Sequence, residues 1–165
     1  MPKRRHDPNP VEALVGVAPL VSRWIERLLA SHEPPLTPAQ FLALRAIAAG
    51  PVTAAELARS TGVSGAAVSQ LVSALHQEGW VDRSPTADDR RRQALALTPA
   101  GADVYRSATR LLEKRLGELL AVLPRKEVEE LSRLLHGLEQ VLGGSPPPRR
   151  PPPPPPPPPK RPGSR

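Results

Sequence analysis

The sequence predicts a mostly α-helical protein with one small β hairpin. Apolar residues recur at helical spacing over most of residues 11–143, which indicates several amphipathic helices. Several of the expected helix starts carry Ser or Thr, followed either by Pro at the next position or by Gln or Glu three residues later. Residues 80–97 differ, because two short apolar segments flank a polar, charged loop there, a pattern typical of a hairpin.

Charge and proline are unevenly distributed along the chain. The 165 residues carry a formal net charge of +7 and include 24 prolines. Residues 1–10 contribute +2, residues 146–165 contribute +5, and the fifteen basic and fifteen acidic residues of 11–145 cancel. Thirteen of the prolines also lie in the last twenty residues. The part expected to fold, one domain by its length, is therefore electroneutral.

Several classes of protein are excluded by what the sequence lacks. It has no cysteine, which rules out a disulfide scaffold and thiolate metal sites. No apolar run approaches the length that spans a membrane. His6, His32, His76 and His136 are scattered, so we expect surface or helix-end histidines, no metal site and no cofactor. No set of nucleophile and base supports catalysis, and we expect a cytoplasmic protein that is not an enzyme.

The first predicted helix runs from Val11 to about Ser31. Its apolar residues repeat at helical spacing, and the prolines that follow the helix end it. Pro19 either kinks this helix or marks the start of its regular part. Residues 1–10, which contain three prolines and a net positive charge, are expected to form a disordered basic arm.

Three successive helices are predicted in the middle of the chain, beginning after the N-caps Thr37, Thr53 and Ser64. The first two caps each have Gln or Glu three residues later, which completes a capping box. A short turn at Thr61-Gly62-Val63 joins the last two helices, and Gly62 can adopt the positive φ that ends a helix. Two helices joined in this way make a helix-turn-helix.

A β hairpin follows the helix-turn-helix directly. Residues 80–83 and 94–97 are its expected strands, and residues 84–92 its polar loop, which contains five charged residues in succession. A helix-turn-helix followed at once by a hairpin with a basic tip is the outline of a winged helix. A helical bundle with a charged surface loop is the alternative. The agreement of caps, turn and hairpin in one order favours the winged helix.

Two long helices are predicted after Pro99, separated at Leu123-Pro124. They offer more apolar surface than a small winged helix can cover, and the second has a heptad-like seam. Together with the N-terminal helix, they are expected to bury this surface against a second copy of the chain. The expected dimer interface consists of Leu20, Trp24, Leu28, Val128, Leu131, Leu135, Leu138 and Leu142.

Short motifs in a fixed order carry a family resemblance. They are Leu36-Thr37, Gln40-Phe41, Glu56-Leu57-Ala58, Gly62-Val63-Ser64, Leu75, Gly79-Trp80-Val81, Arg83, Asp89-Arg90-Arg91 and Leu97-Thr98-Pro99-Ala100-Gly101. Over residues 11–143 the chain resembles the MarR (multiple antibiotic resistance regulator) family of bacterial transcriptional regulators. The resemblance implies a homodimer whose winged-helix lobes bind a pseudo-palindromic operator in double-stranded DNA. It also implies repression, and release of DNA when a small aromatic or phenolic ligand binds between lobe and dimer domain.

The expected organisation therefore has five parts. They are a disordered basic arm at 1–10, an N-terminal dimerisation helix at 11–35, a winged helix-turn-helix DNA-binding lobe at 36–98, C-terminal dimerisation helices at 99–144, and a disordered proline-rich basic tail at 145–165. Such a protein is expected to associate with the nucleoid in the cytoplasm.

The recognition helix is expected to place its outer face in the major groove. That face has no lysine or arginine, whereas family members commonly carry a basic residue where Gln70 stands. Gln70 can instead read adenine through a bidentate pair, and small neighbours permit close approach; an ordinary helix surface explains each residue equally well. The predicted recognition residues are Ser64, Gly65, Ala66, Ala67, Ser69, Gln70 and Ser73.

Positive charge in the lobe gathers in the wing. Arginine at a wing tip can enter a narrow minor groove. The resemblance implies that Asp89 orients the wing through an arginine pair, and Arg90 and Arg91 divide between that pair and DNA. Arg59 is a further candidate phosphate contact. The predicted wing residues are Arg83, Arg90, Arg91 and Arg92.

A pocket for an effector is conceivable beside the first long helix after the wing. Its candidate lining is Trp24, Ile25, Phe41 and Leu44, although the same residues serve equally well as core.

The proline-rich tail supplies a second hypothesis. Residues 151–159 are nine consecutive prolines, which predict a polyproline II rod about 28 Å long. Arginine and lysine pairs bracket the prolines, and such segments can dock on aromatic-lined grooves. The winged helix would then serve chiefly as a dimeric scaffold for an interaction module. An unselected low-complexity extension without a partner is the alternative.

Overall fold

The structure is a computed structural model that describes residues 9–61, 63–85 and 93–143. It confirms a mostly helical fold with a small antiparallel sheet. The elements are α1 (Pro10–Ala30), α2 (Pro38–Ala48), β1 (Val52–Thr53), α3 (Ala54–Thr61), α4 (Gly65–Gln77), β2 (Val81–Pro85), β3 (Gln93–Leu97), α5 (Pro99–Leu120) and α6 (Arg125–Gly143). Across these ranges no helix has both the length and the apolar character that crossing a membrane requires.

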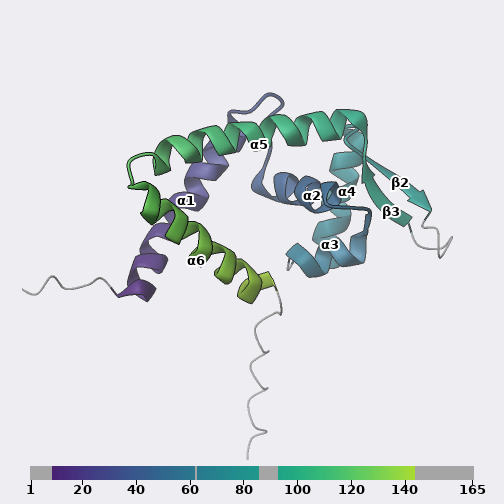
Figure 1. The fold of residues 1–165 in the computed structure, drawn as a ribbon. Coiled ribbons are helices and arrows are strands. Elements are labelled where there is room, and N and C mark those ends of the chain that lie inside the picture. The colour runs from purple at the N-terminus through teal and green to yellow at the C-terminus, as the bar shows by residue number, and fades with distance from the viewer. Residues whose placement is uncertain (1–8, 62, 86–92, 144–165) are drawn as a thin grey trace, which may run out of the picture.

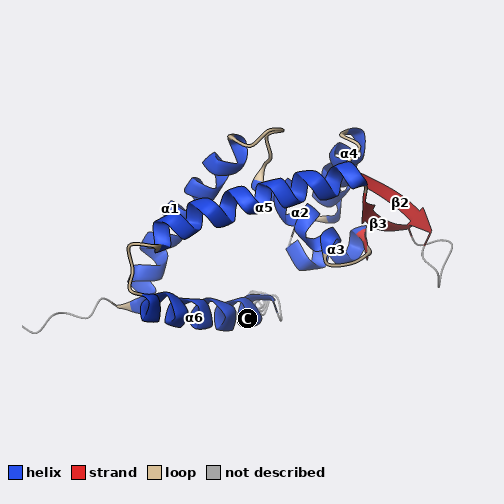
Figure 2. Cartoon of the chain, turned by 45° about the horizontal axis from the view of Figure 1, so that its top comes forward, coloured by secondary structure: helices blue, strands red, loops and turns tan. Residues whose placement is uncertain are grey.

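The molecule has two ends that are joined by the long helix α5 (Figures 1 and 2). At one end lie α2, α3, α4 and the sheet, which we call the lobe (residues 36–98). At the other end lie α1, the second half of α5 and α6, which we call the arm. The first half of α5 packs on the lobe, where the rings of Phe41 and Tyr105 lie 5.8 Å apart. One helix therefore belongs to both ends.

The predicted caps form as expected. Thr37 Oγ1 accepts from the Gln40 backbone N–H at 3.2 Å, and Gln40 Oε1 accepts from the Thr37 backbone N–H at 2.8 Å. Thr53 and Glu56 repeat this capping box at the start of α3. α1 begins at Pro10 and continues through Pro19, so Pro19 does not mark a helix start.

The sheet has one strand more than the predicted hairpin. Its order is β1-β3-β2, with β3 antiparallel to both neighbours. Val52 and Thr53 of β1 lie opposite Leu95 and Ala94 of β3. A strand of two residues has no periodicity of its own, and it forms only because β3 passes beside it.

The core is aliphatic and lies in the lobe, with α5 across it. Leu57, Leu75 and Val81 have no exposed surface, and Val68 and Val72 are almost as well covered. Leu29 at the end of α1 joins the same cluster, as do Ala108 and Leu112 of α5. The core thus fixes α4 and the sheet against each other and leaves most of the arm outside.

A tight junction joins the end of α4 to the start of α5. Gly79 ends α4 with φ +72°, a conformation that favours glycine. The Thr98 backbone N–H donates to Trp80 O at 3.0 Å, and Thr98 Oγ1 donates to Gly79 O at 2.7 Å. A Cβ at Gly101 would lie 1.9 Å from Trp80 O, so this close approach requires glycine. These contacts explain why the motifs Gly79-Trp80-Val81 and Leu97-Thr98-Pro99-Ala100-Gly101 occur in one chain.

Candidate nucleic-acid interface

The helix α4 presents one face to the core and the opposite face to solvent. Val68, Val72 and Leu75 are buried. All seven predicted recognition residues, from Ser64 to Ser73, are exposed on the other side. Since buried and exposed positions alternate at helical spacing, a continuous outer face is available to a partner.

Hydrogen bonds already occupy part of this outer face. Ser64 Oγ caps the helix by accepting from the Ala67 backbone N–H at 3.3 Å. Ser69 Oγ donates to Gly65 O at 2.9 Å, one turn earlier in α4. The Gln70 side chain makes no hydrogen bond within the described part of the chain. Its amide is therefore available to a partner.

A histidine for which the sequence suggested no role fixes α4 relative to the wing. His76 Nδ1 donates to Val81 O at 2.9 Å, and Asp82 Oδ1 lies 3.9 Å from the same nitrogen. The bond joins the last turn of α4 to the first residue of β2. It depends on the tight turn at Gly79, which helical spacing alone does not reveal.

Arg83 lies beside the recognition helix as well as in the wing. It is directly opposite Leu95 in the pairing of β2 with β3, so both side chains leave the same face of the sheet. Leu95 is buried against the helices. Arg83 borders a small cavity of about 140 Å³ whose other lining residues are Ala54, Ser69, Val72 and Leu95. The exposed Arg83 side chain therefore brings positive charge next to α4.

The structure describes only one of the other arginines that are predicted to contact DNA. Arg59 is on α3 with its side chain 73 % exposed, and its nearest carboxylate is Glu56 at 4.0 Å. Asp89 and residues 90–92 at the wing tip lie outside the described residues. The exposed ion pair of Arg59 with Glu56 contributes little stability at 4.0 Å, so Arg59 can turn to a phosphate at low cost.

The residues expected in the dimer interface are grouped on the arm. Leu20, Leu135, Leu138 and Leu142 are 41–78 % exposed in the single chain. Trp24, Leu28, Val128 and Leu131 are partly covered. Both groups lie on α1 and α6, two of the helices that form the arm (Figure 1).

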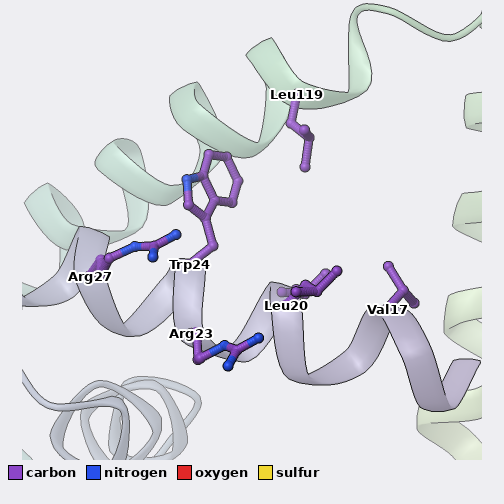
Figure 3. A pocket seen from close by; sticks show the side chains of 7 residues that line it. Val17, Leu20, Arg23, Trp24, Arg27 and Leu119 are labelled. Atoms are coloured by element: carbon purple, nitrogen blue, oxygen red, sulfur yellow. The ribbon is translucent and has the colours of Figure 1, made fainter.

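Trp24 stands in a groove between α1 and α5 (Figure 3). Trp24 and Leu119 approach each other from the two helices, and Val17 and Leu20 continue the apolar lining along α1. The groove has a volume of about 540 Å³. Arg23, Arg27 and Val21 complete its lining.

The four candidate effector residues are not gathered around that groove. Trp24 lines it, whereas Leu44 has no exposed surface and belongs to the core. Ile25 and Phe41 are half-buried and pack against the same core.

His32 directly follows the cap of α1 but is buried rather than on the surface, with 8 % of its area exposed. Its Nδ1 donates to Pro34 O at 2.7 Å, and its Nε2 lies 2.8 Å from Ser107 Oγ. His32 thereby ties the connection between α1 and α2 to α5. Among the described residues, no three histidine or carboxylate side chains come together as a metal site would require.

These features define a helix-turn-helix protein with a β wing and flanking helices, the winged-helix class. A sequence profile described as the MarR family matches residues 35–92. The Multiple antibiotic resistance protein MarR of Escherichia coli is 32 % identical over 131 residues, which cover 77 % of this chain and 91 % of that protein. The chain belongs to the MarR family and is a transcriptional regulator, not an enzyme.

Solved structures agree with this assignment. The crystal structure of wild-type MarR from E. coli matches with a TM-score of 0.67 and 28 % identity, covering 78 % of this chain and 95 % of that one. RV1404 from Mycobacterium tuberculosis matches with a TM-score of 0.70 and 28 % identity, covering 84 % and 95 %. A mutant MarR from E. coli complexed with operator DNA matches with a TM-score of 0.63 and 30 % identity, covering 79 % and 96 %.

Proposed function

We propose that the chain is a sequence-specific repressor that binds a pseudo-palindromic operator as a homodimer in the cytoplasm. The exposed, continuous outer face of α4 carries the proposal, because a recognition helix needs such a face in the major groove. The likeness to the mutant MarR complexed with operator DNA supports it. In this proposal residues 36–98 form the DNA-binding lobe, and residues 11–35 and 99–144 form the dimerisation part.

The homodimer is supported by the apolar surface that one chain leaves uncovered. Val122 is 81 % exposed, Val141 73 % and Val15 68 %. Ten of the fifteen large apolar side chains exposed in the described residues lie on α1 and α6, and monomeric proteins rarely leave so many exposed on two helices. α6 contacts the lobe through the ion pair of Arg45 with Glu139, at 3.1 Å and more than half exposed on both sides. Since so exposed a pair contributes little, a second copy is needed to hold α6.

The contacts with DNA divide among three elements in this proposal. The outer face of α4 reads base edges, Arg90 and Arg91 divide between the minor groove and the pair with Asp89, and Arg59, Arg83 and Arg92 contact phosphates. Asp89 orients the wing. With three to five phosphate contacts in each lobe, the dimer should show a slope of roughly −5 to −9 for log affinity against log salt concentration.

Release by a small aromatic or phenolic ligand is the further part of the proposal. The groove at Trp24 is within the usual size range of ligand pockets and combines apolar residues with an indole ring. Arg23 and Arg27 beside it suit an aromatic anion. Quenching of tryptophan fluorescence by benzoate or phenol, lost in Trp24→Phe, would support this site; the second tryptophan, Trp80, is buried and serves as internal reference.

The test of DNA binding uses the full chain and a library of genomic fragments. Fragments that the protein enriches should contain an inverted repeat, and a duplex of that sequence should bind with the predicted salt slope. Sedimentation of the free protein should give twice the mass of one chain. Failure to enrich any sequence would overturn the proposed function.

A further inference from the structure

We propose that Gln70 reads an adenine in the major groove, so that each operator half-site places an A·T pair under the middle of α4. This inference rests on the proposed function and deepens it, since it names the base pair that the recognition helix selects. It follows from which groups on α4 are free, from the size of their neighbours, and from where the positive charge of the lobe lies.

Gln70 has the one exposed side chain in the first three turns of α4, all of which the structure describes, with both a free donor and a free acceptor in a fork. Ser64 is used as the helix cap, and Ser69 donates to its own helix. Ser73 is also exposed, but a single hydroxyl pairs with any base and does not discriminate. Base discrimination at the centre of this face therefore depends on the Gln70 amide.

The residues around Gln70 are all small. Ala66, Ala67 and Ser73, which lie three or four residues from Gln70, flank it on the exposed face, and no longer side chain there keeps the helix away from the base edges. Gln70 consequently extends farthest from this part of α4. The alanine methyl groups are also suited to contact the 5-methyl group of thymine.

The amide of Gln70 matches adenine and not guanine. Adenine presents an acceptor, N7, beside a donor, the N6 amino group, and an amide can pair with both. Guanine presents two acceptors there, so the carbonyl oxygen of Gln70 would face an acceptor without a hydrogen. A contact between Gln70 and guanine leaves one of these acceptors without a hydrogen bond, and it is therefore disfavoured.

The positions of the positive charges in the lobe agree with base recognition by Gln70. α4 carries no lysine or arginine, while Arg83 of β2 borders the same cavity as Ser69, and Arg59 extends from α3. Phosphate contacts can therefore come from neighbouring elements, which leaves α4 free to read bases. Contacts to phosphates position the helix without selecting a sequence.

The experiment selects duplexes from a fully randomised library with the full chain and three variants. For the wild type we expect an invariant A·T pair near the centre of each half-site. In Gln70→Ala that preference should disappear, and in Gln70→Arg it should shift to G·C, because a guanidinium pairs with guanine O6 and N7. The matched control is Gln140→Ala, another exposed glutamine but on α6 in the arm, which should keep the wild-type preference.

Affinity for the selected duplex gives the second readout. Replacing the central adenine by 7-deazaadenine, which lacks the N7 acceptor, should weaken wild-type binding at least about fivefold and leave Gln70→Ala unaffected. The salt slope should not change in Gln70→Ala, since no phosphate contact is lost. Circular dichroism verifies that each variant is folded.

Two outcomes would overturn the inference while the proposed function stands. They are a central G·C pair in the wild-type selection, and an A·T preference that persists in Gln70→Ala. A selection that enriches no sequence with any variant would instead overturn the proposed function, and the inference with it.

Discussion

The lobe and the arm are built from similar aliphatic residues but cover them very differently. In the lobe, Leu57 and Leu75 are fully buried within one chain. In the arm, Leu142 is 78 % and Val122 81 % exposed. Fully burying one such side chain stabilises a protein by about 1.5–3 kcal/mol. The difference shows that the lobe buries its apolar residues within one chain, whereas the arm leaves many of them exposed, as the proposed homodimer requires.

The largest effect is expected from breaking the apolar seam of the arm. Leu138→Arg combined with Leu142→Arg should weaken association of the two copies by about 3–5 kcal/mol, more than a hundredfold, because unpaired charges would be buried. Analytical ultracentrifugation measures the dissociation constant. Gln140→Arg, exposed and off the seam, is the control and should leave it unchanged. A double variant that stays fully dimeric would contradict this interface.

The next effect concerns the junction that joins lobe to α5. Gly101→Ala should destabilise the protein by about 3 kcal/mol, because the new methyl group overlaps the Trp80 carbonyl oxygen. The free energy of unfolding in urea measures the change. Gly117→Ala in the same helix meets no atom within 4 Å and should be neutral or stabilise by up to about 1 kcal/mol. Equal stabilities of the two variants would refute the close contact.

A smaller effect is expected at the wing tip. Arg90→Ala with Arg91→Ala should weaken operator binding about tenfold, or about 1.4 kcal/mol, because the minor-groove contact and the arginine pair that orients the wing are both lost. Fluorescence anisotropy with a labelled operator measures the affinity. Arg125→Ala with Lys126→Ala removes the same charge from the arm and should change the affinity less than twofold. Unchanged binding in the wing variant would exclude a role of the wing.

The smallest effect on DNA binding is expected from removing the tail. A chain that ends after Gly144 should bind the operator within about twofold of the full chain, if the tail is an unselected extension. The tail carries +5, so a loss of affinity with a flatter salt slope would instead identify it as a basic arm that contacts phosphates. Titration of both chains at two salt concentrations distinguishes the cases.

Features that depend on residues close in sequence were predictable. The capping boxes at Thr37 and Thr53 and the hairpin strands are all present. Each depends on residues a few positions apart, so the geometry is implied by the spacing. The predicted recognition face of α4 is exposed for the same reason, since helical spacing determines which residues share a side.

Features that depend on contacts across the chain were not predictable. The strand β1 exists because β3 passes beside it, and His32 is buried because Ser107, 75 residues later, meets its ring. The position of Arg83 beside Ser69 depends on the register of β2 with β3. No local pattern specifies such a register.

The helices, their order and the winged helix were thus evident from the residues alone, because they follow from local hydrogen bonding and periodicity, and the uneven charge is a matter of composition. Three features required the three-dimensional packing: the way α5 joins the lobe to the arm, the amount of apolar surface that the arm leaves exposed, and the position of Arg83 beside α4, a helix without lysine or arginine. Burial and proximity are properties of packed elements. They are set by contacts between residues far apart in the chain, which no short spacing encodes.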